Sequence, residues 1–317
     1  MSKFGYSYES IQGRRAVVLA YRGSGKELCV KVAPELGNNV YCFKVGDVDV
    51  IHHDPRHDVA SYFTGNPILY PIPNRCENCR YTFEGKGYWQ AKNNVPIFLH
   101  SLVYDESWAY EPPVVTDSEA RVSSYIKIDE SHPVYGGFPF KHTLKVTYRL
   151  TATGLECMHE VHNEGPSNLP FGISYHTYLP KRPGARICVP ARHVMEVTDA
   201  LLPTGRLLDA TGAYDLGKSV DVDSLQLDDC YTGFDKSAAV FVDYPDVGLQ
   251  IMMDGTEDFT HVQVYTPPEG KPFFCAEMQT CGTDAINMAA KGYERESRLQ
   301  IVKPGDSKSG VMRISYK

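Results

Sequence analysis

One histidine and its neighbours form the segment of this chain in which acid–base chemistry is easiest to place. His176 lies within the proline-bounded stretch 170–180 and is close to tyrosines on both sides. Side chains of a β-strand alternate between its two faces, so Ser174, His176 and Tyr178 would share one face of a strand here. A polar face of this kind is typical of the floor of a wet cleft. A lone histidine is more often a satisfied structural residue, and that interpretation stays open on this segment alone.

A second candidate is the glutamate of an otherwise apolar run nearer the C-terminus. Glu277 lies within Phe273–Met278, where the other residues are Phe, Cys, Ala and Met. A carboxylate in such a strand must be paired, hydrogen-bonded or shifted in pKa, because burial of an isolated charge is unfavourable. A carboxyl group whose pKa is raised toward neutrality is what a general base needs. We therefore expect Glu277 to belong to a functional site.

Three further polar residues are weaker candidates by position alone. Arg75 follows Pro73 and Asn74 in a loop, where its guanidinium could act as an oriented hydrogen-bond donor. His100 comes directly after the apolar run 95–99, and a satisfied core histidine is the simpler explanation there. Asp228 is the first of two adjacent acids before a turn, and such acids are usually solvated or capping.

Two clusters contain the residue types that bind metals. Cys76 and Cys79 have the spacing of half a zinc site, but no second cysteine pair with that spacing occurs. A redox CxxC motif would need a βαβ context, which the sequence lacks. The stretch His52–Asp58 is rich in histidine and aspartate, yet Pro55 would break a helix presenting them together. We expect a solvated loop there, and neither a metal nor a cofactor in the protein.

Composition and charge exclude several classes of partner. The 317 residues carry a formal net charge of −7, without the basic cluster that binds a nucleic-acid backbone. The N-terminal residues lack the apolar core of a secretory signal, and no run reaches the ~18 apolar residues of a membrane helix. Nine scattered cysteines, an odd number, favour reduced thiols over a disulfide framework. We expect a cytoplasmic protein, and neither nucleic acid nor a membrane as a partner.

The elements that position the candidate residues are predicted to be strands. Alternating or apolar runs separated by turn residues predict three hairpins, at 15–21 with 27–32, 141–150 with a run from Leu155, and 239–244 with 248–253. Further strands are expected at 262–265 and 273–280. The proline-rich and glycine-rich stretch 64–83 predicts an irregular loop, and convincing helical patterns are scarce.

The overall composition favours the same fold class. The chain contains 21 Tyr, 13 Phe and 21 Pro, a mixture typical of antiparallel sheets punctuated by turns. Neither a fixed-period repeat nor a low-complexity linker divides the chain. We predict an all-β fold in which residues 1–317 form one large antiparallel β-sandwich domain.

The candidate residues, taken in order along the chain, resemble the galactose mutarotase (aldose 1-epimerase) family. The resemblance extends over nearly the whole chain and depends on the order of its landmarks rather than on any single motif. These landmarks are Pro73-Asn74-Arg75, residues 83–86 with Tyr88, Leu99-His100 with Trp108, His176-Thr177-Tyr178, and the segments 201–205, 227–229, 264–267, 277–280 and 303–305.

The resemblance implies a galactose mutarotase-like supersandwich and an isomerase of carbohydrate metabolism. The implied reaction interconverts the α and β anomers of an aldohexose, without metal or cofactor. It opens the ring when a base removes the C1 hydroxyl proton and an acid protonates the ring oxygen. By resemblance, Glu277 is the base, His176 is the acid, and His100 helps to polarise the ring oxygen. Arg75 and Asp228 would bind hydroxyls at the far side of the sugar.

The sequence departs from the family pattern at four positions, namely Ser101, Tyr104, Tyr175 and Met278. We expect these residues close to the sugar pocket, where they would change the substrate more than the chemistry. Two alternatives follow. One is a carbohydrate-binding protein that kept the fold and lost turnover. The other is a hexose-6-phosphate 1-epimerase, which would need extra cations, with Arg80, Lys86, Lys181 and Arg182 as candidates.

Overall fold

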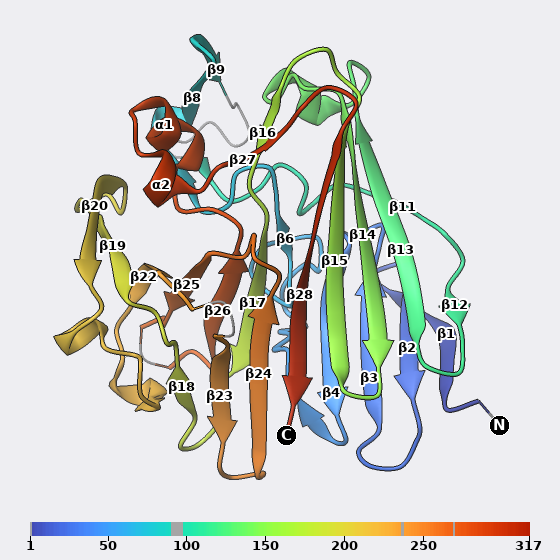
Figure 1. Cartoon of the computed structure of the whole chain (residues 1–317). Coiled ribbons are helices and arrows are strands. Elements are labelled where there is room, and N and C mark those ends of the chain that lie inside the picture. The colour runs from blue at the N-terminus through green and yellow to red at the C-terminus, as the bar shows by residue number, and fades with distance from the viewer. Residues whose placement is uncertain (1, 90–97, 236–237, 269) are drawn as a thin grey trace.

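The computed structural model describes residues 2–89, 98–235, 238–268 and 270–317. Within these ranges the chain forms three large antiparallel sheets, three two-stranded ribbons and two short α-helices (Figure 1). The prediction of an all-β fold built from antiparallel sheets is therefore confirmed. Part of the predicted apolar run before His100, namely Val95, Pro96 and Ile97, lies outside the described residues.

The N-terminal strands form a five-stranded sheet in sequence order. They are β1 (Phe4–Ile11), β2 (Arg14–Tyr21), β3 (Leu28–Ala33), β4 (Asn39–Val45) and β5 (Val48–Asp49). Val17, Leu19, Val30 and Val32 alternate along their strands and are fully buried on one face. The first predicted hairpin is confirmed as β2 and β3. Strand β1, which pairs with β2, was not predicted.

A ten-stranded sheet contains the long central strands. Its spatial order is β11-β13-β14-β15-β28-β24-β23-β18-β21, and β12 pairs with β13. The bounds are β11 (Ala109–Tyr110), β12 (Val114–Val115), β13 (Ala120–Ile128), β14 (His142–Thr151), β15 (Gly154–Asn163), β18 (Arg186–Cys188), β21 (Val220–Asp221), β23 (Val240–Tyr244), β24 (Leu249–Gly255) and β28 (Ser307–Tyr316). Both remaining predicted hairpins are confirmed here, as β14 with β15 and β23 with β24.

A seven-stranded sheet carries most of the candidate site residues. Its order is β20-β19-β22-β25-β26-β17-β6. The bounds are β6 (Ile68–Leu69), β17 (Ser174–Pro180), β19 (His193–Val197), β20 (Pro203–Asp209), β22 (Asp228–Thr232), β25 (His261–Tyr265) and β26 (Phe273–Gln279). The predicted strands at 262–265 and 273–280 are thus confirmed as β25 and β26.

Short ribbons and helices surround one end of this sheet. The ribbons pair β7 (Arg75–Cys76) with β10 (Phe98–Leu99), β8 (Arg80–Phe83) with β9 (Lys86–Trp89), and β16 (Leu169–Phe171) with β27 (Gln300–Val302). The helices are α1 (Ala285–Ala290) and α2 (Glu294–Ser297). The stretch 64–83, expected to be an irregular loop, therefore contains three short strands.

The sheets pack as layers around one large hydrophobic core, and a small second cluster is formed by Ala16, Ala33, Tyr41 and Val59. In Figure 1 the strands β13, β14, β15, β28 and β24 stand side by side in the foreground, with the five-stranded sheet behind them. Val30, Val146 and Val264, one from each large sheet, belong to the same cluster of buried side chains. This packing leaves one face of the seven-stranded sheet free to carry polar residues. Within the described ranges, no helix has the length and apolar character needed to cross a membrane.

Candidate active site

The predicted base and the predicted acid are neighbours across two paired strands. In the antiparallel register of β17 and β26, His176 lies directly opposite Glu277. The Nε2 atom of His176 lies 3.3 Å from Oε1 of Glu277. The residues are only 4% and 2% exposed, and both line a cavity of about 400 Å³. Strand register thus brings together two residues far apart in sequence, on the open face of the sheet.

The surroundings of this pair favour its uncharged form. Burial, and then the nearby carboxylate of Asp228, raise the pKa of Glu277 well above its ordinary value. Burial also lowers the pKa of His176, to about 3, because an imidazolium is poorly solvated there. In this form the carboxyl of Glu277 and the imidazole of His176 share one titratable proton, which either group can carry. Such a pair can give a proton to one atom of a ligand while taking a proton from another.

His100 contacts the pair from a neighbouring segment. Its ring centroid lies 5.1 Å from that of His176, in an edge-to-face arrangement, and 4.9 Å from that of Tyr62. Its backbone N–H donates to the carbonyl oxygen of Asn74 at 2.7 Å. Its φ of 56° is unusual for a residue with a side chain. Burial, followed by the charges of His176 and Arg75, lowers the pKa of His100 well below its usual range. A neutral imidazole therefore faces the cavity.

A closed ring of hydrogen bonds forms one wall of the cavity. Arg75 donates through Nη2 to Oδ2 of Asp228 at 3.2 Å and through Nη1 to Oδ1 of Asn74 at 3.0 Å. Gln263 completes the ring, because it accepts from Nδ2 of Asn74 at 3.0 Å and donates to Oδ1 of Asp228 at 2.7 Å. Mutual bonding of this kind fixes each group in one orientation. The free lone pairs and N–H groups can then bind hydroxyl groups of a ligand.

Asn74 and Gln263 are site residues that the sequence reasoning missed. Asn74 lies in the motif Pro73-Asn74-Arg75, but only Arg75 of that motif was predicted to be a site residue. Gln263 lies opposite both Cys230 and Glu277 in neighbouring strands. Its position on the polar face of β25, among buried valines, was the signal that could have identified it, since a buried amide needs partners.

Aromatic side chains form the remaining walls. The ring of Tyr178 stacks on that of His176, with centroids 4.7 Å apart and planes 7° apart. The hydroxyl of Tyr178 donates to the backbone carbonyl of Tyr62 at 2.7 Å, which holds the stacked ring in place. Tyr265 and Phe273 also line the cavity. Flat apolar walls with a few fixed polar groups are typical of small-molecule sites.

The loop 52–63 has a larger role than predicted. The sequence predicted a solvated loop for residues 52–58, but His57 lines the cavity, together with Tyr62 and Phe63 from the next few residues. His57 stacks against Phe63 with a centroid distance of 5.7 Å. The prediction of a solvated loop holds for the exposed residues 55–58, and in addition the loop lines part of the cavity.

The cysteines of the CxxC segment have no metal-site geometry. Cys76 and Cys79 are both buried, and the thiol of Cys76 donates to the carbonyl oxygen of Arg80 at 3.2 Å. The described part of the chain contains no group of three His, Cys, Asp or Glu residues arranged to hold a metal ion.

The four departures from the family pattern lie outside the cavity lining, contrary to expectation. Ser101 is fully buried, and its hydroxyl donates to the backbone carbonyl of Ile68 at 3.0 Å. The rings of Tyr104 and Tyr62 make an edge-to-face contact, with centroids 5.1 Å apart. Tyr175 and Met278 follow the alternation of β17 and β26 and point to the reverse face, away from the cavity. None of the four lines the cavity, so they do not alter its polar surface directly.

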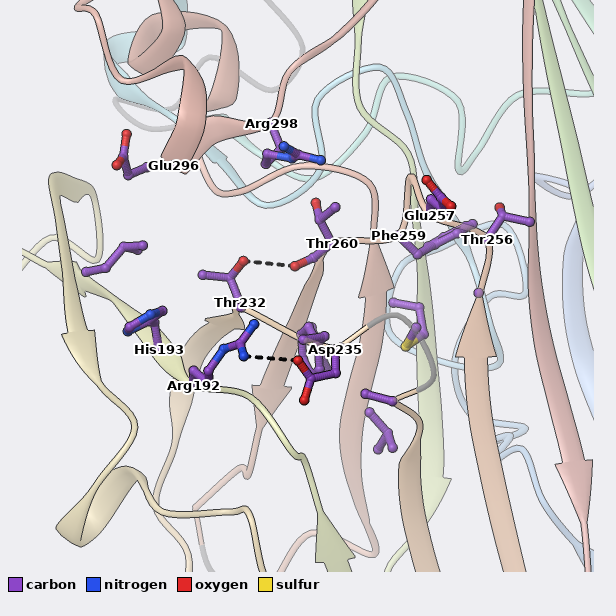
Figure 2. Close-up of a pocket in the computed structure, with 18 of the residues that line it drawn as sticks. Arg192, His193, Thr232, Asp235, Thr256, Glu257, Phe259, Thr260, Glu296 and Arg298 are labelled. Carbon is purple, nitrogen blue, oxygen red and sulfur yellow. Dashed lines mark hydrogen bonds and ion pairs between the residues drawn. The ribbon is translucent and has the colours of Figure 1, made fainter.

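A larger cavity, of about 550 Å³, lies on the reverse side of the same strands. Figure 2 shows its rim, where Arg192 pairs with Asp235, and the hydrogen bond from Thr232 to Thr260. Apolar residues from β23, β25 and β26, among them Val240, contribute to its lining. Its Arg192–Asp235 pair is mostly exposed, and none of the five predicted site residues lines it. The smaller cavity is therefore the candidate active site.

Comparisons with known proteins agree with this fold. A family model described as aldose 1-epimerase matches residues 24–315. A galactose mutarotase-like protein from Clostridium acetobutylicum has a TM-score of 0.89 at 18% identity, with 99% of each chain covered. A galactose 1-epimerase from Lactobacillus acidophilus NCFM has a TM-score of 0.78 at 13% identity, covering 100% of this chain and 99% of that chain.

Sequence similarity to curated proteins is more local. The uncharacterised protein YphB of Escherichia coli strain K12 is 29% identical over 119 residues, which span 38% of each chain. At these identities the solved structures show a shared fold, whereas the family model covers most of the sequence. On that match, this chain belongs to the aldose 1-epimerase family.

Proposed function

We propose that this protein is an aldose 1-epimerase that interconverts the α and β anomers of an aldohexose by acid–base ring opening. The observation that carries the proposal is the 3.3 Å contact between His176 and Glu277 at the floor of a sugar-sized cavity. The two oxygens of a hemiacetal are bonded to one carbon, so the groups that act on them must also be neighbours. The register of β17 and β26 provides this proximity.

The reaction uses the one proton that the pair holds. With a cyclic sugar bound, ionised Glu277 accepts the C1 hydroxyl proton while protonated His176 donates to the ring oxygen, and the bond from C1 to that oxygen breaks. The products are an open-chain aldehyde and a neutral acid–base pair. Rotation about the C1–C2 bond and the reverse transfers close the ring to the other anomer. Because burial favours the neutral pair, each ring opening is preceded by transfer of the shared proton from Glu277 to His176 across their 3.3 Å contact.

His100 and the hydrogen-bonded wall have supporting roles in this proposal. His100, as a neutral imidazole, donates a hydrogen bond toward the ring oxygen and helps to polarise it. Arg75 and Asp228 bind hydroxyls at the other end of the sugar, with Asn74 and Gln263 holding them in place. Such a division is needed because C1 must rotate while the rest of the sugar stays bound.

Substitution of Arg75 or Asp228 in the hydrogen-bonded wall is expected to weaken sugar binding more than it lowers kcat. Arg75→Ala and Asp228→Asn should each raise KM by about 10- to 100-fold, the effect of losing one hydrogen bond to a charged group. Steady-state polarimetry over a range of sugar concentrations checks this. An unchanged KM with a collapsed kcat in these variants would contradict the role proposed for the wall.

The pH dependence of the reaction provides an independent prediction. The pair is active with one proton, so kcat/KM should be bell-shaped, and loss of that proton defines the alkaline limb. The negative charge of Asp228 helps to raise the pKa of Glu277. Asp228→Asn removes that charge, lowers the pKa of Glu277 and should move the alkaline limb to lower pH. An alkaline limb that stays in place or moves to higher pH would show that Glu277 does not control it.

The function is tested with freshly dissolved α-glucose and α-galactose, whose optical rotation relaxes as the anomers equilibrate. Enzyme should accelerate this relaxation for at least one aldose in a panel of free and 6-phosphorylated sugars. If binding is measurable by calorimetry but no sugar relaxes faster, the protein is a carbohydrate-binding protein instead, and the proposed function is wrong.

The panel also tests the hexose-6-phosphate alternative. None of the four cations predicted for that reaction lines the cavity. Two of them are engaged elsewhere, since Lys181 pairs with Asp223 and Arg182 pairs with Asp246. Among the described residues that line the cavity, Lys271 is the one lysine. We therefore propose a free aldose as the substrate, and a marked preference for the phosphorylated sugar would overturn that choice.

A further inference from the structure

The segment around Arg75 has a strained backbone. Asn74, Asn78 and Cys79 have φ values of 61°, 53° and 54°, a region that residues with side chains rarely adopt. Each such residue costs free energy and persists only where surrounding contacts hold it. The guanidinium of Arg75 can therefore keep its orientation only if other parts of the protein fix this segment.

The contacts that fix it come from the start of helix α1. The backbone N–H of Asp284 donates to the carbonyl oxygen of Arg75 at 3.1 Å. Oδ1 of the Asp284 side chain accepts from the backbone N–H of Glu77 at 3.3 Å and from Nδ2 of Asn287 at 2.8 Å. Asp284 thus binds the segment on both sides of Cys76.

Asn287 extends these contacts to the next strand. Its Nδ2 atom donates to the carbonyl oxygen of Arg80 at 2.8 Å, and its Oδ1 atom accepts from the backbone N–H of Thr82 at 3.1 Å. Asn287 is 8% exposed and Asp284 is 3% exposed. Because both are buried, water cannot replace these bonds without cost. The two side chains together bind three backbone groups of residues 77–82, and we call them the α1 brace.

The segment held by the α1 brace also supports His100. Strand β7 pairs with β10, with Arg75 opposite Leu99, and the next residue, His100, donates its N–H to the carbonyl oxygen of Asn74. The His100 ring is held as well by its contacts with His176 and Tyr62, so a shift of the braced segment would displace chiefly the guanidinium of Arg75. Asp284 itself follows β26, the strand that carries Glu277, after only a few residues.

We propose that Asp284 and Asn287 are positioning residues for Arg75, which set sugar affinity through the contacts of the α1 brace without touching the sugar. Neither residue lines the cavity. This inference rests on the proposed function of the same site. It predicts that the brace acts only through the cavity wall, so its effect should vanish when Arg75 is absent.

The test is a double-mutant cycle on KM, with sugar Kd from calorimetry as a readout that does not need turnover. Asp284→Ala and Asn287→Ala should each raise KM and Kd by about tenfold, since small misplacements of binding groups are costly, while kcat changes much less. In an Arg75→Ala background the same changes should add less than about twofold, because coupled residues are not additive. Equal effects in both backgrounds would overturn the proposal.

Two matched variants separate positioning from general stability. Asp284→Asn keeps an Oδ1 acceptor for both Glu77 and Asn287, and Asn tolerates the φ of 53°, so this variant should restore wild-type KM. Asn163→Ala removes a comparable buried amide, which binds the carbonyl oxygens of Ser167 and Val302, and should lower Tm without changing KM. A raised KM in either variant would show that the α1 brace has only a structural role.

The outcomes also distinguish this inference from the proposed function. Sugar binding without turnover, weakened in Asp284→Ala and restored in Asp284→Asn, would refute the epimerase proposal and support the brace. Normal turnover with unchanged KM in both alanine variants would refute the brace and leave the epimerase proposal standing. If the alanine variants do not fold, Asn287→Ser provides the same comparison with a smaller loss of volume.

Discussion

Glu277→Gln is expected to lose about 10²- to 10⁴-fold in kcat, the usual contribution of a positioned general base. Glutamine has the shape of a protonated glutamate but cannot accept the C1 hydroxyl proton. The loss corresponds to about 3–5 kcal/mol in the barrier. Polarimetry on purified protein, with circular dichroism to confirm folding, measures it. A variant that retains near-normal rates would show that Glu277 is not the base.

The same substitution should stabilise the folded protein at neutral pH. Burial holds the pKa of Glu277 above its ordinary value of 4.5, so the folded state keeps a proton that the unfolded state loses. The stability linked to that proton is fully present below about pH 4.5 and is lost as pH rises toward the folded-state pKa. Glutamine has no such dependence. The Tm of Glu277→Gln should exceed that of the wild type at pH 7, and the difference should shrink toward pH 4.

His176→Asn is expected to lose kcat by a similar factor of about 10²- to 10⁴-fold. The asparagine side chain is polar but cannot donate a proton to the ring oxygen. Since the acid and the base act in one step, the double variant with Glu277→Gln should be little slower than either single variant. Full additivity of the two losses would indicate that the residues act in separate steps.

The control for His176→Asn addresses its packing. The imidazole stacks on Tyr178, so part of any loss could come from movement of that ring. Tyr178→Phe keeps the ring and removes the hydroxyl that binds the backbone of Tyr62. This variant should retain most of the activity. A loss as large as that of His176→Asn would show that the wall of the cavity, rather than the proton donor, limits the rate.

Local patterns correctly predicted the three hairpins, the strands β25 and β26, and the faces of the site strands, but not β1 or the three short strands within 64–83. Alternation along 174–178 placed His176 and Tyr178 on one face, and both line the cavity. The apolar run around Glu277 indicated a buried carboxyl, and its environment raises its pKa as expected. These successes depend on the two-residue period of a strand, which is a local property of the sequence.

The two-residue period of a strand also explains why one prediction, the placement of Tyr175 and Met278, was wrong. Met278 follows Glu277 and Tyr175 precedes His176, so each must point to the opposite face of its strand from its neighbour. Both were expected near the sugar pocket because they are close in sequence to site residues. The structure places both on the reverse face, where Tyr175 stacks on Phe259 in the core.

Other parts of the site depend on long-range packing and could not be predicted from local patterns. Arg75 and Asp228 are 153 positions apart, and tertiary folding brings Arg75 of β7 to Asp228 at the start of β22. The position of Asp228 alone favoured a solvated acid. The loop with His57 and Phe63 likewise reaches the cavity through tertiary contacts. The two-residue period of a strand does not predict which distant segments come together, so the family resemblance was needed to connect these residues.

The most direct test of the account compares anomer relaxation of fresh α-galactose and α-glucose under the wild type, Glu277→Gln and a control. Glu196→Gln is a suitable control, because this carboxylate pairs with Arg206 outside the cavity. We predict rapid relaxation with the wild type and Glu196→Gln, and relaxation near the buffer rate with Glu277→Gln. Equal acceleration by all three proteins would contradict the claim that His176 and Glu277 open the sugar ring.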